Sequence, residues 1–152
     1  MKTIKIILFI LLLLFIIIQF FPKDLPDNHP VDDSDLISVI AIPDEMAAIL
    51  RNSCYDCHSN QVKYPWYAYV APTAWLVAKD VREGRSELNF SEWGDYSIRN
   101  LIGRLDAIEE EVTSGSMPLP VYTLMHRKTK LDEDQAEAIV KWAEEYTESI
   151  FE

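Results

Sequence analysis

The stretch "SCYDCHSN", residues 53–60, constrains this chain more than any other feature. It contains the only two cysteines, Cys54 and Cys57, and His58 directly follows the second. Two cysteines separated by two residues are typical of three chemistries: a redox-active disulfide, half of a zinc site, and the attachment point of a c-type haem. The rest of the chain has to distinguish among these interpretations.

The first 21 residues combine two lysines with a long apolar run. Residues 4–21 of "MKTIKIILFILLLLFIIIQFF" reach the ~17 to 25 residues that a helix needs to cross a bilayer. Lys2 and Lys5 favour a cytoplasmic N-terminus, which places everything after Phe21 outside the cytoplasm. A cleaved signal peptide is the alternative, but no A-x-A-like site follows the run. We therefore expect a single-pass, uncleaved anchor in the inner membrane, with the remaining chain on the periplasmic side.

The charge of the chain excludes one class of partner. All 25 acidic residues but only 12 of the 14 basic residues follow Phe21, so this part carries a net charge of −13. Nucleic-acid binding requires clustered positive charge, and we expect no nucleic-acid partner. An acidic surface is better suited to a protein partner with a basic docking patch.

Composition divides the chain into three segments. Residues 1–21 are the expected anchor, which is predicted to contact the lipid bilayer through residues 4–21. Residues 22–43 are rich in proline and aspartate, a composition typical of an extended tether. Within the tether, "LISVIAI" is apolar enough to dock on the domain as a short strand or an extended segment. Residues 44–152 have the length of one ordinary domain.

Apolar residues recur at helical spacing through most of residues 44–152. "DEMAAILRNSCYDCHS" predicts a short helix that leads into the cysteine pair. "YPWYAYVAPTAWLVAKDVREG" begins as an aromatic loop and then predicts a helix of about three turns, with Pro72 in its first turn and Gly84 as its end.

Two longer helices are predicted in the second half of the domain. The first lies within residues 95–115 and ends at Gly115, and the last one begins with a capping box made by Asp132 and Gln135. "LNFSEW" is expected to be a loop, and so is "SMPLPVY", because its two prolines block regular structure. We thus predict an all-α domain of about four helices joined by long loops.

The helical pattern and the export signal favour one interpretation of the cysteine pair. A thioredoxin-type dithiol is expected near a βαβ pattern, and none is visible. A structural zinc ion needs four ligands, usually from two cysteine pairs, and the second pair is missing. In c-type haem attachment, which takes place outside the cytoplasm, two thiols add to the vinyl groups of haem. The sequence therefore predicts one covalent haem c on Cys54 and Cys57, with His58 as the proximal iron ligand.

The second axial ligand of the iron is less constrained by the sequence. Met117 lies in a proline-stiffened loop between two helices, where its side chain can be held at a fixed point, and we predict it as the distal ligand. His126 is the alternative, and Met125 comes next; a methionine would raise the reduction potential relative to a histidine. Met46 is expected to belong to the core and His29 to the solvated tether. An open site is the remaining possibility.

Other side chains are candidates for contacts with the haem. Arginines can bind its carboxylates, although each is equally explained as a surface residue; the candidates are Arg82, Arg85 and Arg99. Aromatic rings can cover its flat face, although most are expected in the core; they are Tyr64, Trp66, Tyr67, Tyr69 and Trp75. The acidic run at 109–111 is interpreted as a solvated helix face.

Four stretches of residues 52–143 resemble a known family: "NSCYDCHSN" followed by "YPWY", "EGRSELNFSEW", "GSMPLPVYTLMH" and "KLDEDQAEAIVKWA". In order, they resemble the small bacterial haem-binding domain with a single CxxCH, common in Bacteroidetes-type proteins. The resemblance implies a cytochrome c-like helical domain around one haem, with Cys54 and Cys57 attached to it and His58 as proximal ligand. Met117 and His126 both fall within the matching stretches. Longer proteins of the family join this domain to cytochrome c or di-haem peroxidase modules, and this chain contains neither.

Two functions are compatible with these observations. The first is a membrane-anchored, mono-haem electron carrier without enzymatic activity, which exchanges electrons with redox proteins outside the cytoplasm. The second is a haem-based sensor or small peroxidase whose iron keeps an open or displaceable distal position. His126 is the only histidine of the domain that could supply the distal acid–base group of a peroxidase.

Overall fold

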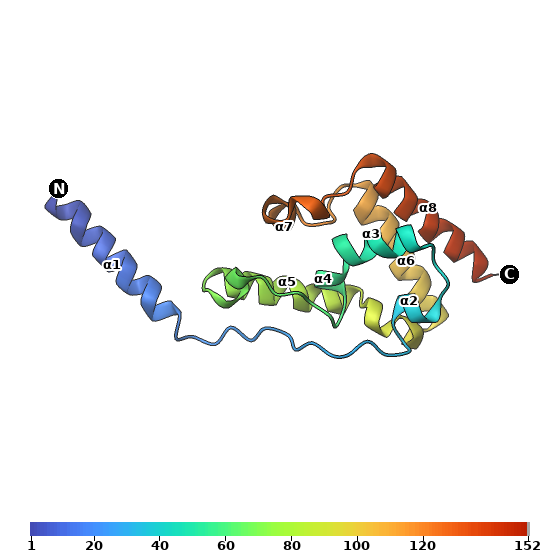
Figure 1. Cartoon of the computed structure of the whole chain (residues 1–152), viewed down its shortest axis with the longest axis horizontal. Coiled ribbons are helices and arrows are strands. Elements are labelled where there is room, and N and C mark those ends of the chain that lie inside the picture. Colours follow the sequence, from blue (N-terminus) through green and yellow to red (C-terminus); the bar gives the residue numbers. More distant parts are fainter. Residues whose placement is uncertain (152) are drawn as a thin grey trace.

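The computed structural model describes residues 1–151, which form eight α-helices and three short 3-10 helices (Figure 1). The predicted all-α class is confirmed for these residues, none of which lies in a strand. In chain order the elements are α1 (Lys2–Ile18), α2 (Leu36–Val39), α3 (Asp44–Ser53), α4 (Tyr55–His58), η1 (Trp66–Tyr69), α5 (Thr73–Glu87), η2 (Phe90–Asp95), α6 (Ile98–Thr113), α7 (Pro120–Met125), η3 (Arg127–Thr129) and α8 (Glu133–Ser149).

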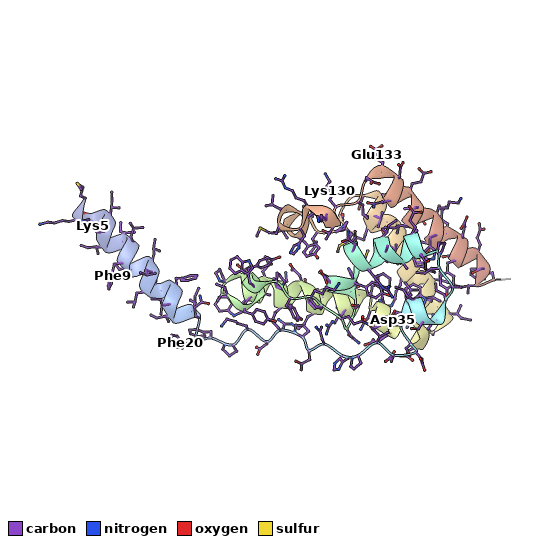
Figure 2. All side chains as sticks on the ribbon, in the orientation of Figure 1. Lys5, Phe9, Phe20, Asp35, Lys130 and Glu133 are labelled. Atoms are coloured by element: carbon purple, nitrogen blue, oxygen red, sulfur yellow. The ribbon has the colours of Figure 1, made fainter. Side chains whose placement is uncertain are left out.

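Helix α1 projects away from the rest of the chain, and its apolar side chains are exposed (Figures 1 and 2). It ends at Ile18; the side-chain amide of the following residue, Gln19, donates to the carbonyl of Ala71 and accepts from its N–H, at 3.0 and 2.9 Å. Its 17 residues rise about 26 Å, whereas the hydrocarbon core of a bilayer is about 30 Å thick. Among residues 1–151, none of the helices has the length and apolarity that crossing a membrane requires. The transmembrane helix predicted over residues 4–21 is therefore not supported.

Residues 22–43 run along the domain beside α5 and are hydrogen bonded to it (Figure 1). Asn28 exchanges two bonds with the backbone of Val62, at 2.7 and 2.9 Å. Within "LISVIAI", Leu36–Val39 form the one-turn helix α2 and the following Ile40 is extended; Leu36 is completely buried in the core. Four further side chains donate to backbone carbonyls of this segment: Tyr64 to Pro26, Trp75 to Pro22, Arg82 to Asp24 and Arg85 to Asp27.

Helix α5 continues past Gly84 to Glu87, so the prediction that Gly84 ends this helix is wrong. Gly84 is a buried helical residue at the contact between α4 and α5. A Cβ atom on Gly84 would lie 2.8 Å from the carbonyl oxygen of Cys57, which is closer than real Cβ contacts allow. The glycine is therefore required by the close approach of the two helices and not by a helix end.

Two segments that were predicted to be loops contain helical turns. "LNFSEW" forms most of η2, whose Phe90 and Trp93 side chains are buried in the core. "SMPLPVY" is irregular only as far as Leu119, because Pro120 occupies the first turn of α7. A proline is tolerated there since the N–H that it lacks has no partner within a helix.

Helices α6 and α8 pack against each other and carry much of the core. Helix α6 ends as predicted, with Gly115 in the left-handed region at φ +70°. The predicted capping box of α8 is also confirmed: Asp132 accepts from the N–H of Gln135 at 2.8 Å, and the Gln135 side chain accepts from the N–H of Asp132 at 3.2 Å. These two helix ends define the position of the connection that carries Met117.

Candidate functional site

A cavity of about 610 Å³ opens between α4, the end of α5, and α6. This volume lies within the roughly 300–1,000 Å³ range of small-molecule and cofactor sites. Most of its wall is apolar, and the apolar side chains include Leu50, Leu88, Phe90, Ile108, Val112 and Ile139. Cys54, His58 and Met117 line the same cavity. The structure therefore brings together three of the residues that the sequence analysis selected.

The cysteine motif lies on a tight turn. Helix α3 ends at Ser53, and the N–H groups of Cys57 and His58 both donate to the carbonyl of Cys54, at 3.1 and 3.0 Å. Cys54 faces the large cavity, whereas Cys57 lines a smaller hollow of about 40 Å³ on the other side of the turn. The two half-buried cysteines are free thiols.

Burial raises the pKa of both thiols, with a further increase for Cys54 from the neighbouring Cys57. The pKa of Cys54 rises to about 12 and that of Cys57 to about 11. Redox-active dithiols depend on the opposite shift, since the thiolate is the reacting form. The environment of the pair therefore does not favour the dithiol interpretation.

The imidazole of His58 is oriented by two backbone carbonyls. Its Nδ1 atom lies 2.9 Å from the oxygen of Gly84 and 3.1 Å from that of Leu88. Because carbonyl oxygens only accept hydrogen bonds, Nδ1 carries the hydrogen and donates it. Burial lowers the pKa of His58, against the opposing effect of the two carbonyls, and so favours the neutral ring. Nε2 then keeps its lone pair, which is the form of histidine that binds a metal.

Met117 is half-buried in the connection between α6 and α7. Its backbone N–H donates to the carbonyl of Glu111 at 3.1 Å, so the chain folds back against the last turns of α6. Farther along, the Tyr122 hydroxyl donates to Oδ2 of Asp56, inside the cysteine motif, at 2.7 Å. The connection that carries Met117 is therefore attached to the domain on both sides.

The other predicted distal ligands are not brought to this cavity. The Nε2 atom of His126 is hydrogen bonded to the hydroxyl of Tyr67, and its ring stacks on another tyrosine ring. The Met125 side chain points into solvent, with 62% of its surface exposed. Met46 is buried in the core and His29 is exposed, as expected from the sequence.

Of the three predicted arginines, only Arg99 lines the cavity. Arg82 and Arg85 donate to backbone carbonyls elsewhere, including those of Asp24 and Ser59. Arg104, which the sequence analysis missed, also lines the cavity. One signal could have found it: Arg104 interrupts the apolar face of α6, three residues after Leu101 and four before Ile108.

The aromatic lining of the cavity also differs from the prediction. None of the aromatic residues between 64 and 75 lines it, whereas Phe90 from η2 does. The Phe90 ring stacks on Tyr55 with 5.1 Å between ring centroids and meets His58 edge-on at 6.4 Å. Phe90 was missed because its segment was interpreted as a loop.

The residues of the cavity fit a haem. A haem is flat and largely apolar with two carboxylates, and the apolar wall matches the first property. Arg99 and Arg104 line the cavity, and a guanidinium is a suitable partner for a carboxylate. At Gly103, on the same helix, a Cβ atom would meet no other atom within 4 Å, which leaves open space against α6. Cys54 and His58 would supply the attachment and ligand chemistry.

The helical fold and this cavity define a small single-site cofactor-binding domain. Residues 13–145 match the family described as Haem-binding domain, and the chain belongs to that family. The family match supports haem as the cofactor of this chain. No curated protein and no solved structure matches the chain.

Proposed function

We propose that this chain is a mono-haem c-type cytochrome domain that binds its haem covalently and transfers single electrons outside the cytoplasm. The observation that carries the proposal is the orientation of His58. Its Nδ1–H donates to two backbone carbonyls, and it lines the same cavity as Cys54 and Met117. A histidine held in this way presents Nε2 as a proximal ligand directly after the attachment site.

Covalent attachment is proposed at both thiols: Cys54 lines the cavity of His58, whereas Cys57 lines the hollow on the other side of the turn and would have to rotate toward the haem. Each S–H group adds across one vinyl double bond: sulfur bonds to one carbon, the hydrogen goes to the other, and no oxidant is consumed. Cys54 and Cys57 are both free thiols and not a disulfide, and this is the oxidation state that the addition needs. His58 follows Cys57 directly, so attachment at the cysteines and ligation by the histidine involve one short turn.

Met117 is proposed as the distal ligand because it lines the cavity of His58, while His126 and Met125 do not. When bound, the haem iron supplies a one-electron couple, and a methionine thioether raises its potential relative to a second imidazole. The apolar wall limits the access of water to the site. This arrangement favours electron transfer over the sensor or peroxidase alternative, since the only candidate distal acid–base group, His126, is hydrogen bonded elsewhere.

The charge distribution supports a basic redox partner. Exposed acidic residues lie along helices α6 and α8, among them Asp106, Glu110, Glu137 and Glu145. Such a surface attracts a partner with a basic patch and accelerates its encounter at low ionic strength.

We also propose that the domain lies on the periplasmic side of the inner membrane and contacts the bilayer through α1. The support is the chemistry of this helix, whose apolar side chains, such as Phe9, are exposed and which begins with Lys2 and Lys5 (Figure 2). Apolar surface of this extent is typical of segments that bury in lipid or in a partner.

The test uses the full-length chain produced in a cell that matures c-type cytochromes. Mass spectrometry should find one haem added to the intact chain, and serine at both Cys54 and Cys57 should abolish the addition. The ferric protein should show the weak near-infrared band of methionine ligation. Met117→Ala should remove this band, and Met125→Ala, the matched control, should retain it. A high-spin ferric spectrum with ready carbon monoxide binding after reduction would contradict the electron carrier and favour the sensor or peroxidase.

A further inference from the structure

We propose that Arg104, together with Arg99, is the binding site for the carboxylate groups of the haem. The inference rests on the proposed placement of haem in this cavity, and it adds the residues that orient the cofactor by its charged edge. The carrying observation is that two arginines of α6 line the cavity and form no ion pair within residues 1–151.

The Nε atom of Arg104 has less than 1 Å² of accessible surface and no hydrogen-bond partner. An atom with so little accessible surface does not face the cavity. The two Nη atoms of Arg104 are not buried in this way and have no hydrogen-bond partner in residues 1–151, so they are the donors that a ligand in the cavity would meet.

The guanidinium of Arg104 is held in position without an acidic partner. Its central carbon lies 4.2 Å from the centroid of the Tyr96 ring, a cation–π contact. Tyr96 is itself fixed, since its hydroxyl accepts from the N–H of Asn89 at 2.8 Å and donates to the Asn89 carbonyl at 3.2 Å. In the described part of the chain, the two ion pairs are on other residues. The positive charge is thus fixed in direction and available to a ligand.

The neighbouring residues of α6 define the class of ligand. Arg99 and Asn100 line the same cavity, and Gly103 adds no side chain between them and Arg104. Arginine presents a planar fork of N–H donors that matches a carboxylate with two parallel bonds. A ligand with two carboxylates on one edge, as haem has, would satisfy both arginines. The cavity also contains Glu87 and Glu111, and an anionic ligand is therefore expected to lie toward the arginine end of α6.

The first experiment uses the mature, haem-containing protein. Resonance Raman spectroscopy should report the bending vibration of the haem carboxylates, which shifts when a guanidinium no longer binds them. We expect a shift in Arg104→Gln and none in Arg127→Gln, a control that removes an exposed arginine outside the cavity. If the Arg104→Gln protein does not incorporate haem, Arg104→Lys is the second variant. Lysine retains the positive charge but lacks the paired N–H donors of a guanidinium, and it should shift the same vibration.

The second experiment uses the unmodified full-length chain without haem. Iron mesoporphyrin has no vinyl groups and cannot form thioethers, so its affinity reports the cavity alone. We expect the diacid to bind at least about tenfold more tightly than its dimethyl ester, because charge-assisted bonds are lost in the ester. Arg104→Gln should reduce this ratio toward one, and Arg127→Gln should leave it unchanged.

The outcomes separate this inference from the proposed function. If haem is attached but Arg104→Gln changes neither the vibration nor the affinity ratio, the carboxylate site is wrong and the cytochrome proposal stands. If no haem becomes attached, the proposal of covalent binding is wrong. The ratio of the affinities for the diacid and the dimethyl ester of iron mesoporphyrin then still tests the role of Arg104. Equal binding of diacid and diester to the unmodified chain overturns the inference without any substitution.

Discussion

The two sides of the haem cavity are constructed differently. On the His58 side, a one-turn helix packs directly on α5, and the imidazole is held by the carbonyls of Gly84 and Leu88. On the other side, the half-buried Met117 lies in an irregular connection. The backbone N–H of Met117 forms one hydrogen bond, to the carbonyl of Glu111. Secondary structure therefore fixes the first side, whereas turn residues and a few hydrogen bonds position the second. Substitutions on the two sides should have correspondingly different effects.

The largest effect is expected from Gly84→Ala. The new Cβ would lie 2.8 Å from the oxygen and 3.2 Å from the carbon of the Cys57 carbonyl, so the backbone of α4 or α5 must move. We expect a loss of about 2–3 kcal/mol in the free energy of unfolding, as for overpacked cores, together with lower haem incorporation. Chemical denaturation of the haem-free chain measures the first and absorbance of the matured protein the second. Gly103→Ala, which meets no atom, should instead stabilise the haem-free chain by up to about 1 kcal/mol. Equal destabilisation by both alanines would contradict the close contact of α4 and α5.

An intermediate effect is expected from Tyr122→Phe. This change removes the hydroxyl that donates to Asp56 at 2.7 Å and so releases α7 from the cysteine motif. Loss of a hydrogen bond to a carboxylate should cost about 1.5 kcal/mol, and hydrogen exchange should accelerate in residues 114–126 more than in α5. Tyr69→Phe is the matched control, because the exposed Tyr69 hydroxyl makes no hydrogen bond to residues 1–151. Equal acceleration of hydrogen exchange in residues 114–126 and in α5 would contradict a local role for the hydrogen bond between Tyr122 and Asp56.

The smallest effect is expected from Gly115→Ala. Gly115 adopts φ +70°, which costs an alanine about 1 kcal/mol, and it sets the direction of the chain two residues before Met117. We expect a small loss of stability and a weaker near-infrared methionine band in the ferric protein. Ser116→Ala, next to it and outside the left-handed region, should leave the band intact. An unchanged band in Gly115→Ala would show that the position of Met117 does not depend on this turn.

Local signals in the sequence accounted for much of the fold. Helical periodicity, the capping box at Asp132 and the glycine at Gly115 predicted the two helices α6 and α8 and their facing ends. These signals work because capping and left-handed turns depend on residues that are neighbours in the chain. The CxxCH motif likewise contains the proposed attachment residues and the proposed ligand within one short turn.

Signals that depend on distant residues were misread or missed. Gly84 was interpreted as a helix end, although the reason for the glycine is Cys57, which packs against it from another helix. Phe90 was placed in a loop because its burial depends on Tyr55 and on the core behind it. Arginine is typical of a protein surface, and only the tertiary structure shows that Arg104 lines the cavity. In each case the deciding contact joins segments that the sequence does not place side by side.

The sequence by itself determined the chemistry of this protein: two thiols and an imidazole at a spacing that suits haem, in a helical chain of the haem-binding domain family. Only the tertiary structure decided which side chains share the cavity with them. It brought Met117 to the cavity of His58 and kept His126 out, and it placed Arg104 in the wall. The physical reason is that covalent spacing is local, whereas a cavity is formed by helices that meet through packing.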